Sequence, residues 1–230
     1  MKVIVGSDLH IPFQHDEAVD EFLAYIKREK PGVVILNGDI KDAYHVSSHM
    51  KKPDMGTISD ASESLQVIDF LKRVWKAAPY GCRLYYLCGN HELRMEKYLL
   101  RNAPALYFGE GWKIPMVLRL DENDFAWVEY GEMVEIDGVT YMHGELLSCI
   151  PGNSVRKHVQ KFGRPMVVGH CHRGSVINMR FGGKLMSGME CGCLCTEKAG
   201  SDYVRAPDWH LGWGKVVDGK MEFILAENQL

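Results

Sequence analysis

The first ninety residues alternate between short apolar runs and amphipathic stretches. The runs at 2–6, 31–39 and 83–90 are apolar and contain or end in glycine, which predicts buried strands. The stretches at 16–30 and 64–78 carry apolar residues at helical spacing, which predicts helices. This order predicts parallel strands joined by helices that pack outside the sheet.

Each predicted helix has an apolar face that can be assigned from the same spacing. The faces consist of Ala18, Phe22, Tyr25 and Ile26 in the first helix and of Leu65, Ile68, Leu71 and Trp75 in the second. We expect both faces to be buried.

Turn signals dominate the second half of the chain. Hairpin turns are predicted at Asp137-Gly138 within 133–144, at Gly182-Gly183 within 175–195, and at Asp218-Gly219 within 214–227. A further strand is expected after the second of these hairpins. The run at 165–170 predicts another buried strand.

A short helix is predicted at 153–163, capped by Asn153 or Ser154 and ended by Gly163. The stretches 42–60 and 102–123 are predicted to be irregular, and loops of that length are often functional. A parallel half and a more antiparallel half together predict two mixed sheets, packed face to face with helices outside. The chain shows no linker, repeat or low-complexity segment, so we expect one domain over residues 1–230.

Composition narrows the class of protein only slightly. Hydrophobic residues make up 46% of the chain and charged residues 25%, and the net charge of −3 gives no argument for or against a nucleic-acid partner. Seven cysteines, an odd number in a chain of this size, do not suggest a disulfide framework and favour a cytoplasmic location. No apolar run reaches the ~18 residues of a membrane span, and the N-terminal run is too short for a signal peptide.

The predicted strands share one chemical feature, which is that polar, ligand-type residues follow where each of them ends. These residues are Asp8 and His10; Asp39 and Asp42; Asn90, His91 and Glu92; His143; and His170 and His172. The carboxyl edge of an open α/β sheet is where ligands bind, and the neighbouring glycines allow close approach. The pattern therefore predicts one shared site.

The number of donors indicates more than one cation. Seven nitrogen or oxygen donors exceed the three or four that one catalytic metal takes from a protein, and they suit two metals that share a carboxylate. The seven are Asp8, His10, Asp39, Asn90, His143, His170 and His172. Imidazole and carboxylate suit manganese, with iron, zinc and nickel as alternatives.

The same motifs resemble the calcineurin-like metallophosphoesterases. The residues that carry the resemblance are Asp8-Leu9-His10, Gly38-Asp39 with Asp42, Gly89-Asn90-His91-Glu92, His143, and Gly169-His170-Cys171-His172. The resemblance implies a four-layer α/β/β/α sandwich and a two-metal site. One metal would be held by Asp8, His10, Asp39 and His172, and the other by Asp39, Asn90, His143 and His170.

The resemblance also implies catalytic roles. A hydroxide between the two divalent cations would attack phosphorus. His91 would protonate the leaving oxygen or stabilise the charge that develops on the phosphoryl group, and Asp42 would orient His91. Substrate contacts are expected from Asn90, His91, Arg94 and Arg173, although the two arginines could equally form surface salt bridges.

The expected substrate is a phosphate ester. Ala43-Tyr44 follows Asp42, where phosphoprotein phosphatases carry an arginine that grips phosphate, so a phosphodiester such as a nucleotide or nucleic acid is favoured. No stretch that combines basic and aromatic residues supports binding to long DNA. A phosphomonoesterase acting on a small molecule or phosphoprotein, and a non-catalytic scaffold, remain alternatives. No membrane partner is expected, and the sequence gives no oligomeric state.

Several residues keep two interpretations. Cys191, Cys193 and Cys195 alternate, which indicates one face of a buried strand or a thiol-based metal or redox centre. Cys171 is interpreted as a small buried spacer. Tyr44, His45 and His49 either line the cleft or belong to an ordinary loop, and Trp209, His210 and Trp213 either wall the site or pack in the core.

Overall fold

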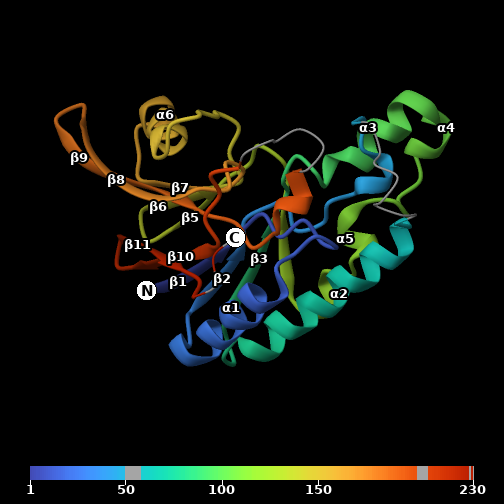
Figure 1. Cartoon of the computed structure of the whole chain (residues 1–230), viewed down its shortest axis with the longest axis horizontal. Coiled ribbons are helices and arrows are strands. Elements are labelled where there is room, and N and C mark those ends of the chain that lie inside the picture. The colour runs from blue at the N-terminus through green and yellow to red at the C-terminus, as the bar shows by residue number, and fades with distance from the viewer. Residues whose placement is uncertain (50–57, 201–206, 228, 230) are drawn as a thin grey trace.

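Two mixed β-sheets pack face to face between helices in the computed structural model of the chain, which describes residues 1–49, 58–200, 207–227 and 229 (Figure 1). The first sheet has the strand order β11-β10-β1-β2-β3-β4 and the second has the order β5-β6-β7-β9-β8. The parallel pairs β1–β2 and β2–β3 confirm the predicted parallel half.

The strand bounds follow the sheet order. In the first sheet they are β11 Lys220–Leu225, β10 Gly212–Val217, β1 Lys2–Gly6, β2 Val33–Leu36, β3 Arg83–Leu87 and β4 Phe125–Val128. In the second they are β5 Val134–Ile136, β6 Val139–Met142, β7 Met166–Val168, β9 Lys184–Cys191 and β8 Gly174–Phe181. The three predicted hairpins are confirmed.

Helices cover the outer faces of both sheets. They are α1 Asp16–Glu29, α2 Asp60–Ala77, α3 Leu93–Asn102, α4 Pro104–Tyr107, α5 Ile114–Val117 and α6 Asn153–Phe162, with short 3₁₀ turns η1 Tyr44–Val46, η3 Asp121–Asn123 and η4 Glu197–Gly200. None of the described helices is long and apolar enough to cross a membrane.

Alternation along the strands divides the core into layers. Ile4 of β1 packs with the residues of α1 and α2, whereas Val3 and Val5 belong to the apolar layer between the two sheets. On the far side, Val155 and Val159 of α6 pack on the outer face of the second sheet. These layers confirm the predicted α/β/β/α sandwich.

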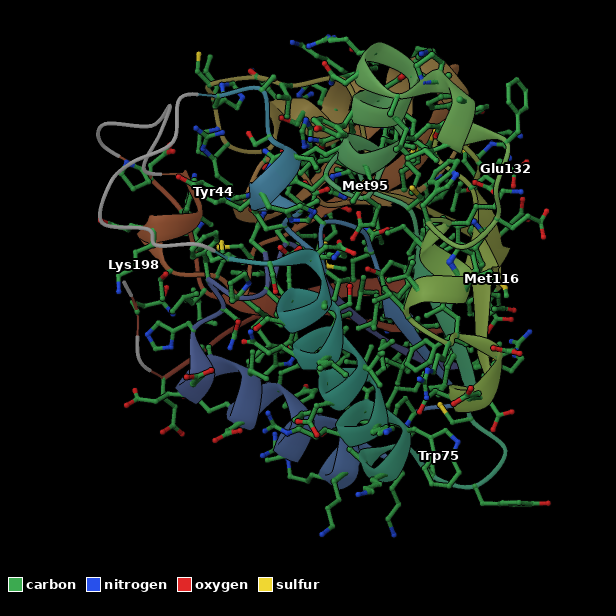
Figure 2. The ribbon with its side chains drawn as sticks, turned by 90° about the vertical axis from the view of Figure 1, so that its right-hand side faces the viewer. Tyr44, Trp75, Met95, Met116, Glu132 and Lys198 are labelled. Carbon is green, nitrogen blue, oxygen red and sulfur yellow. The ribbon has the colours of Figure 1, made fainter. Side chains whose placement is uncertain are left out.

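The helix α2 differs from the prediction in its start and its buried face. It begins at Asp60, where Ser59 accepts a hydrogen bond from the Ser62 backbone N–H at 3.2 Å. Leu65 is 66% exposed and Trp75 is 50% exposed, because the buried stripe is centred on Val67, Leu71 and Val74. Each residue turns the helix by about 100°, which places Leu65 on the side opposite to that stripe. Trp75 lies near the end of the helix, where its Nε1–H donates to the Asp124 carboxylate at 3.1 Å. Figure 2 shows α1 and α2 side by side, with Trp75 at the surface.

The cap of α6 also differs. Its N-cap is Gly152, which has no side chain, so the prediction of Asn153 or Ser154 as cap is wrong. The buried Glu190 carboxylate takes that role from β9 and accepts the N–H groups of Gly152 at 2.7 Å and Val155 at 3.2 Å. Gly163 ends the helix in the left-handed conformation, as predicted.

Two predicted irregular stretches contain structure. The stretch 102–123 holds α4, α5 and η3, and both α3 before it and β4 after it were not predicted. The stretch 42–60 holds η1, and its residues 50–57 lie outside the described residues. A further strand was expected after the hairpin within 175–195. Among the described residues β9 ends at Cys191, and only isolated β-bridges follow it, so this strand is not formed there.

Candidate metal centre

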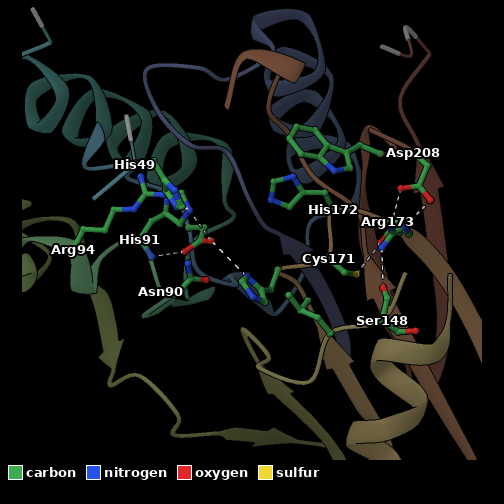
Figure 3. Close-up of a pocket in the computed structure, with 13 residues that line it drawn as sticks. His49, Asn90, His91, Arg94, Ser148, Cys171, His172, Arg173 and Asp208 are labelled. Carbon is green, nitrogen blue, oxygen red and sulfur yellow. Dashed lines mark hydrogen bonds and ion pairs between the residues drawn. The ribbon is translucent and has the colours of Figure 1, made fainter. Parts of the chain in front are cut away.

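Loops from both sheets meet at one rim of the sandwich. The loops after β1, β2 and β3 bring Asp8, His10, Asp39 and Asn90 from the first sheet. The loops after β6 and β7 bring His143, His170 and His172 from the second sheet. All seven predicted donors therefore gather in one place, and Figure 3 shows the cavity into which several of them point.

The backbone at this rim is held in an uncommon conformation. Asp8, His10, Asp39, His170 and His172 have φ values of 54°, 49°, 52°, 66° and 59°, in the left-handed region that non-glycine residues rarely occupy. Such conformations persist only where the surrounding structure imposes them, and they cluster at functional sites.

Asp39 lies at the centre of the cluster and is 1% exposed. Its Oδ2 atom lies 3.2 Å from His143 Nε2, 3.9 Å from His10 Nε2 and 3.9 Å from His170 Nδ1. A single carboxylate thus faces imidazoles from both predicted ligand sets. This is the geometry expected of a shared, bridging ligand.

The approach of loops to Asp39 depends on glycine. A Cβ atom at Gly89 would collide with the Asp39 carboxylate, and one at Gly38 would collide with the His143 ring. Gly38 also has a φ of 86°, which L side chains rarely adopt. The glycines in the motifs are therefore needed for the donors to converge.

Nitrogen lone pairs face each other across the site. His10 Nδ1 lies 2.9 Å from Asp42 Oδ2, and His143 Nδ1 lies 2.8 Å from the backbone carbonyl of Asn37. These acceptors hold the proton on Nδ1 and turn each Nε2 inward, as hydrogen-bond acceptors behind metal-binding histidines do. His10 Nε2 then lies only 3.1 Å from His172 Nε2.

Two buried atoms at the site have no hydrogen-bond partner among the described residues. They are Asp8 Oδ1 and His170 Nδ1. Asp8 Oδ1 lies 3.2 Å from His172 Nε2, and His170 Nδ1 is directed to Asp39. Buried polar atoms normally find a partner. Oxygen and imidazole donors that face one another without forming hydrogen bonds fit divalent cations.

Burial and neighbouring charge set the protonation of the donors in opposite ways. Burial lowers the pKa of His10 to about 4, and the neighbouring His91 adds to this effect, so its imidazole is neutral as a ligand must be. Burial also opposes charge on His143, but the adjacent Asp39 carboxylate outweighs it and raises the pKa to about 10. Burial acts against the Asp39 carboxylate too, yet the charges of His143 and His91 hold its pKa well below its usual value.

Asp42 contacts more than the predicted partner. Its Oδ2 atom lies 3.2 Å from His91 Nδ1, as the prediction of an orienting role requires, and also 2.9 Å from His10 Nδ1. Its Oδ1 atom accepts a hydrogen bond from Arg94 Nη1 at 2.9 Å. Arg94 Nη2 in turn lies 3.0 Å from His91 Nε2. One carboxylate therefore orients two imidazoles and an arginine.

Glu92 organises the loop that carries Asp39, which the sequence analysis did not predict. Its buried carboxylate accepts N–H groups from Asp39 at 3.0 Å, Ile40 at 2.9 Å, Lys41 at 3.0 Å and Gly89 at 2.9 Å. No signal within Gly89-Asn90-His91-Glu92 reveals this role, because Asp39, Ile40 and Lys41 lie far from Glu92 in the sequence.

A cavity of about 380 Å³ opens over the donors. All four predicted substrate-contact residues line it: Asn90, His91, Arg94 and Arg173. Arg173 is at the same time paired with Asp208, with Nη2 2.6 Å from Oδ1, and Nη1 donates to the backbone carbonyl of Ser148 at 3.0 Å (Figure 3).

Some of the residues for which the sequence left two interpretations line the cavity, and the others lie away from it. His49, Cys171 and Trp209 line the cavity, and the Trp209 ring lies 4.2 Å from that of His172. The others are held elsewhere. Tyr44 packs on Phe13, His45 lies near Asp60, His210 accepts the Gly174 N–H and Trp213 packs on Phe22 and Tyr25.

The cysteine run is buried but is not one strand. Cys191, Cys193 and Cys195 are each 0% exposed, and only Cys191 lies in β9. Cys195 Sγ lies 3.9 Å from His172 Nδ1, a contact that the sequence analysis missed. All seven cysteines are free thiols.

Residues 1–189 match the family model of the calcineurin-like phosphoesterases, and the chain belongs to this family. It is 25% identical to the Gene 54 protein of Mycobacterium phage D29, over 95% of this chain and 89% of that protein. Among solved structures, it is similar to Vacuolar Protein Sorting 29 from Cryptosporidium parvum, with 17% identity, a TM-score of 0.46 and coverage of 100% and 98%. It is also similar to nuclease MPE of Pseudomonas putida, with 13% identity, a TM-score of 0.39 and coverage of 96% and 87%.

Proposed function

We propose that this protein is a phosphodiesterase that works with two divalent cations. The observation that carries the proposal is the convergence of six donors on Asp39, in which the buried atoms Asp8 Oδ1 and His170 Nδ1 have no hydrogen-bond partner among the described residues. Asp8, His10, Asp39 and His172 would hold one cation. Asp39, Asn90, His143 and His170 would hold the other.

When bound, the cations would supply Lewis-acid stabilisation of phosphoryl oxygens and activation of water. The chain supplies the proton for the leaving oxygen. His91 Nδ1 lies 3.1 Å from the backbone carbonyl of Asp42, which holds a proton on that nitrogen. His91 Nε2 accepts a hydrogen bond from Arg94 Nη2 at 3.0 Å, so substrate would have to displace this contact before Nε2 could carry a proton to the leaving oxygen as the P–O bond breaks.

The charge balance of the cavity supports a diester over a monoester. Both arginines that line it are already paired with carboxylates, Arg94 with Asp42 at 2.9 Å and Arg173 with Asp208 at 2.6 Å. A monoester dianion would need a further uncompensated cation beside the metal site, whereas a diester carries a single negative charge. Ala43-Tyr44 after Asp42 supports the same choice, because no arginine stands there.

The cation and the cell compartment follow from ligand and thiol chemistry. Carboxylate, amide oxygen and imidazole donors suit Mn²⁺, with iron, zinc and nickel as alternatives. Seven unpaired cysteines support a cytoplasmic location, where thiols stay reduced. We also treat residues 1–230 as one domain.

The test compares the hydrolysis rates of two substrates by protein that has been freed of metal and then supplied with Mn²⁺. We expect bis-p-nitrophenyl phosphate to be hydrolysed about tenfold or more faster than p-nitrophenyl phosphate. Faster hydrolysis of the monoester would replace the diesterase by a phosphomonoesterase. Bound metal without turnover of either substrate would favour a non-catalytic scaffold of the same fold.

A further inference from the structure

One face of α3 is basic. Arg94, Lys97, Tyr98 and Arg101 are spaced as i, i+3, i+4 and i+7, so they lie on one side of the helix. Lys97 and Arg101 are exposed, and Tyr98 is 44% exposed. The sequence analysis did not recognise this face because it predicted no helix there.

This face forms one wall of a groove of about 260 Å³. The opposite wall is Val46 of η1 with Ser47 and Ser48, and Figure 2 shows Tyr44 of η1 and Met95 of α3 on neighbouring segments. No acidic side chain is among the described residues that line the groove. Within the described part of the chain, neither Lys97 nor Arg101 forms an ion pair, unlike Arg94. The groove therefore carries positive charge that the described protein leaves uncompensated.

The groove continues from the metal centre. Arg94 lines both the groove and the cavity over Asp39 and His91, so an anion in the cavity lies at one end of the basic face. With a rise of 1.5 Å per residue, Lys97 and Arg101 lie about 4.5 Å and 10.5 Å further along the helix axis. The basic face is therefore longer than a single phosphate group, so it can contact more than one phosphate of the same strand.

We propose that this groove binds the sugar-phosphate backbone of single-stranded nucleic acid next to the phosphodiester in the cavity. Lys97 and Arg101 contact phosphates and Tyr98 offers a ring on which a base stacks. The strand is single because an exposed aromatic ring can stack only on an unpaired base. The assignment of substrate class rests on the proposed function, whereas binding in the groove does not.

The test measures the binding of a fluorescent single-stranded oligonucleotide of about 12 nucleotides by fluorescence anisotropy. A chelator is present so that the oligonucleotide is not cleaved. We expect the double variant Lys97→Ala/Arg101→Ala to raise Kd about tenfold at low salt. The slope of log Kd against log salt should fall by about 1.4, since each phosphate contact on a single strand contributes about 0.7. Loss of stacking in Tyr98→Ala should raise Kd about fivefold, and Tyr98→Phe should restore binding.

The matched control is Lys72→Ala/Lys76→Ala, which removes the same charge from exposed positions of α2 away from the groove. We expect its Kd to stay within about twofold of the unaltered protein. If both double variants weaken oligonucleotide binding equally, the effect comes from net charge alone, and the groove is not the binding site. Unchanged Kd and slope in the α3 variant would also overturn it.

Catalysis is measured separately so that the two proposals can fail independently. For each preparation, the rate on the oligonucleotide is divided by the rate on bis-p-nitrophenyl phosphate, and we expect the α3 variant to lower this ratio about tenfold. The unaltered protein could hydrolyse neither the oligonucleotide nor bis-p-nitrophenyl phosphate while the α3 variant still loses oligonucleotide binding. In that case the proposed phosphodiesterase activity is wrong, but the groove remains a binding site.

Discussion

The Glu92 carboxylate accepts the backbone N–H of Asp39 at 3.0 Å. The same side chain accepts the next two N–H groups, of Ile40 and Lys41, and the hydroxyl of Tyr86 at 2.8 Å. Glu92 is 3% exposed, so these hydrogen bonds are shielded from water. The position of the Asp39 loop is therefore set by Glu92, which does not itself line the cavity over the donors.

Replacement of Glu92 by glutamine should destabilise the fold. An amide has one carbonyl oxygen, and its NH₂ group would face N–H donors, so at least one buried donor loses its partner at a cost of about 1–3 kcal/mol. Urea unfolding with chelator present measures this. Glu132→Gln, at an exposed position, is the control and should change stability by less than about 0.5 kcal/mol. Equal stability of the two variants would contradict the role of Glu92.

Metal binding should depend on Asp39 more than on any single-site ligand. We expect two cations per unaltered chain, about one for Asp8→Asn and none for Asp39→Asn, measured by elemental analysis after equilibration with Mn²⁺. Mn²⁺ at about 100 times its Kd should stabilise the unaltered protein by about 2.7 kcal/mol. Two cations bound to Asp39→Asn would show that the carboxylate is not shared.

His91 should affect turnover without affecting metal content. We expect His91→Ala to keep both cations and to lower kcat on a diester by about 10²–10⁴-fold, because proton transfer by a positioned side chain contributes that much. A substrate with nitrophenolate as leaving group needs less protonation and should lose less. Unchanged turnover would remove His91 from the reaction.

Stability should fall as the pH drops below neutral, in part through His158. Burial lowers the pKa of His158, whose Nε2 accepts the Glu145 N–H at 3.1 Å and whose Nδ1 lies 2.8 Å from the Ser154 carbonyl. The unfolded chain binds a proton near pH 6.5 and the folded chain only at lower pH, so protonation favours unfolding in that interval. Its contribution is complete above about pH 6.5.

The measurement is Tm against pH with chelator present. Since glutamine does not titrate, His158→Gln should show a smaller loss of Tm between about pH 7 and pH 5 than the unaltered protein. Parallel curves for the two proteins would mean that His158 contributes nothing to the acid response.

Thiol labelling should separate the cysteines by burial. Cys149 is exposed and should react first with an alkylating reagent under native conditions. Cys191, Cys193 and Cys195 should react only as the protein unfolds, since all three are 0% exposed and burial raises the pKa of Cys191 to about 12. Rapid labelling of all three thiols in the native protein would instead favour a thiol-based metal or redox centre.

The donor set could be predicted because its signal is local and repeated. The donors follow short apolar strands, and parallel strands deliver their carboxyl ends to one edge of each sheet. Asp8 and His172 meet, although 164 positions separate them, because these edges of the two packed sheets lie at the same rim. The role of Glu92 could not be predicted in this way. It depends on N–H groups that a different strand presents, and no pattern within Gly89-Asn90-His91-Glu92 specifies them.

The missed elements have weak periodicity. In α3 only Leu99 is buried, so the helix has little apolar face to detect. In the four-residue strand β4, Val128 is buried although it shares a face with the exposed Ala126, so burial does not alternate along the strand. The face of α2 was misplaced because Leu65 and Trp75 are apolar but exposed.

The supply of donors from both sheets has a consequence for synthesis on the ribosome. The first sheet contributes Asp8, His10, Asp39 and Asn90, but the last nitrogen comes from His172, and β10, which pairs with β1, is made later still. A nascent chain with only its N-terminal half emerged carries the acidic half of the cluster without the histidines that complete it. Cation capture is therefore a late event, which follows translation of most of the chain.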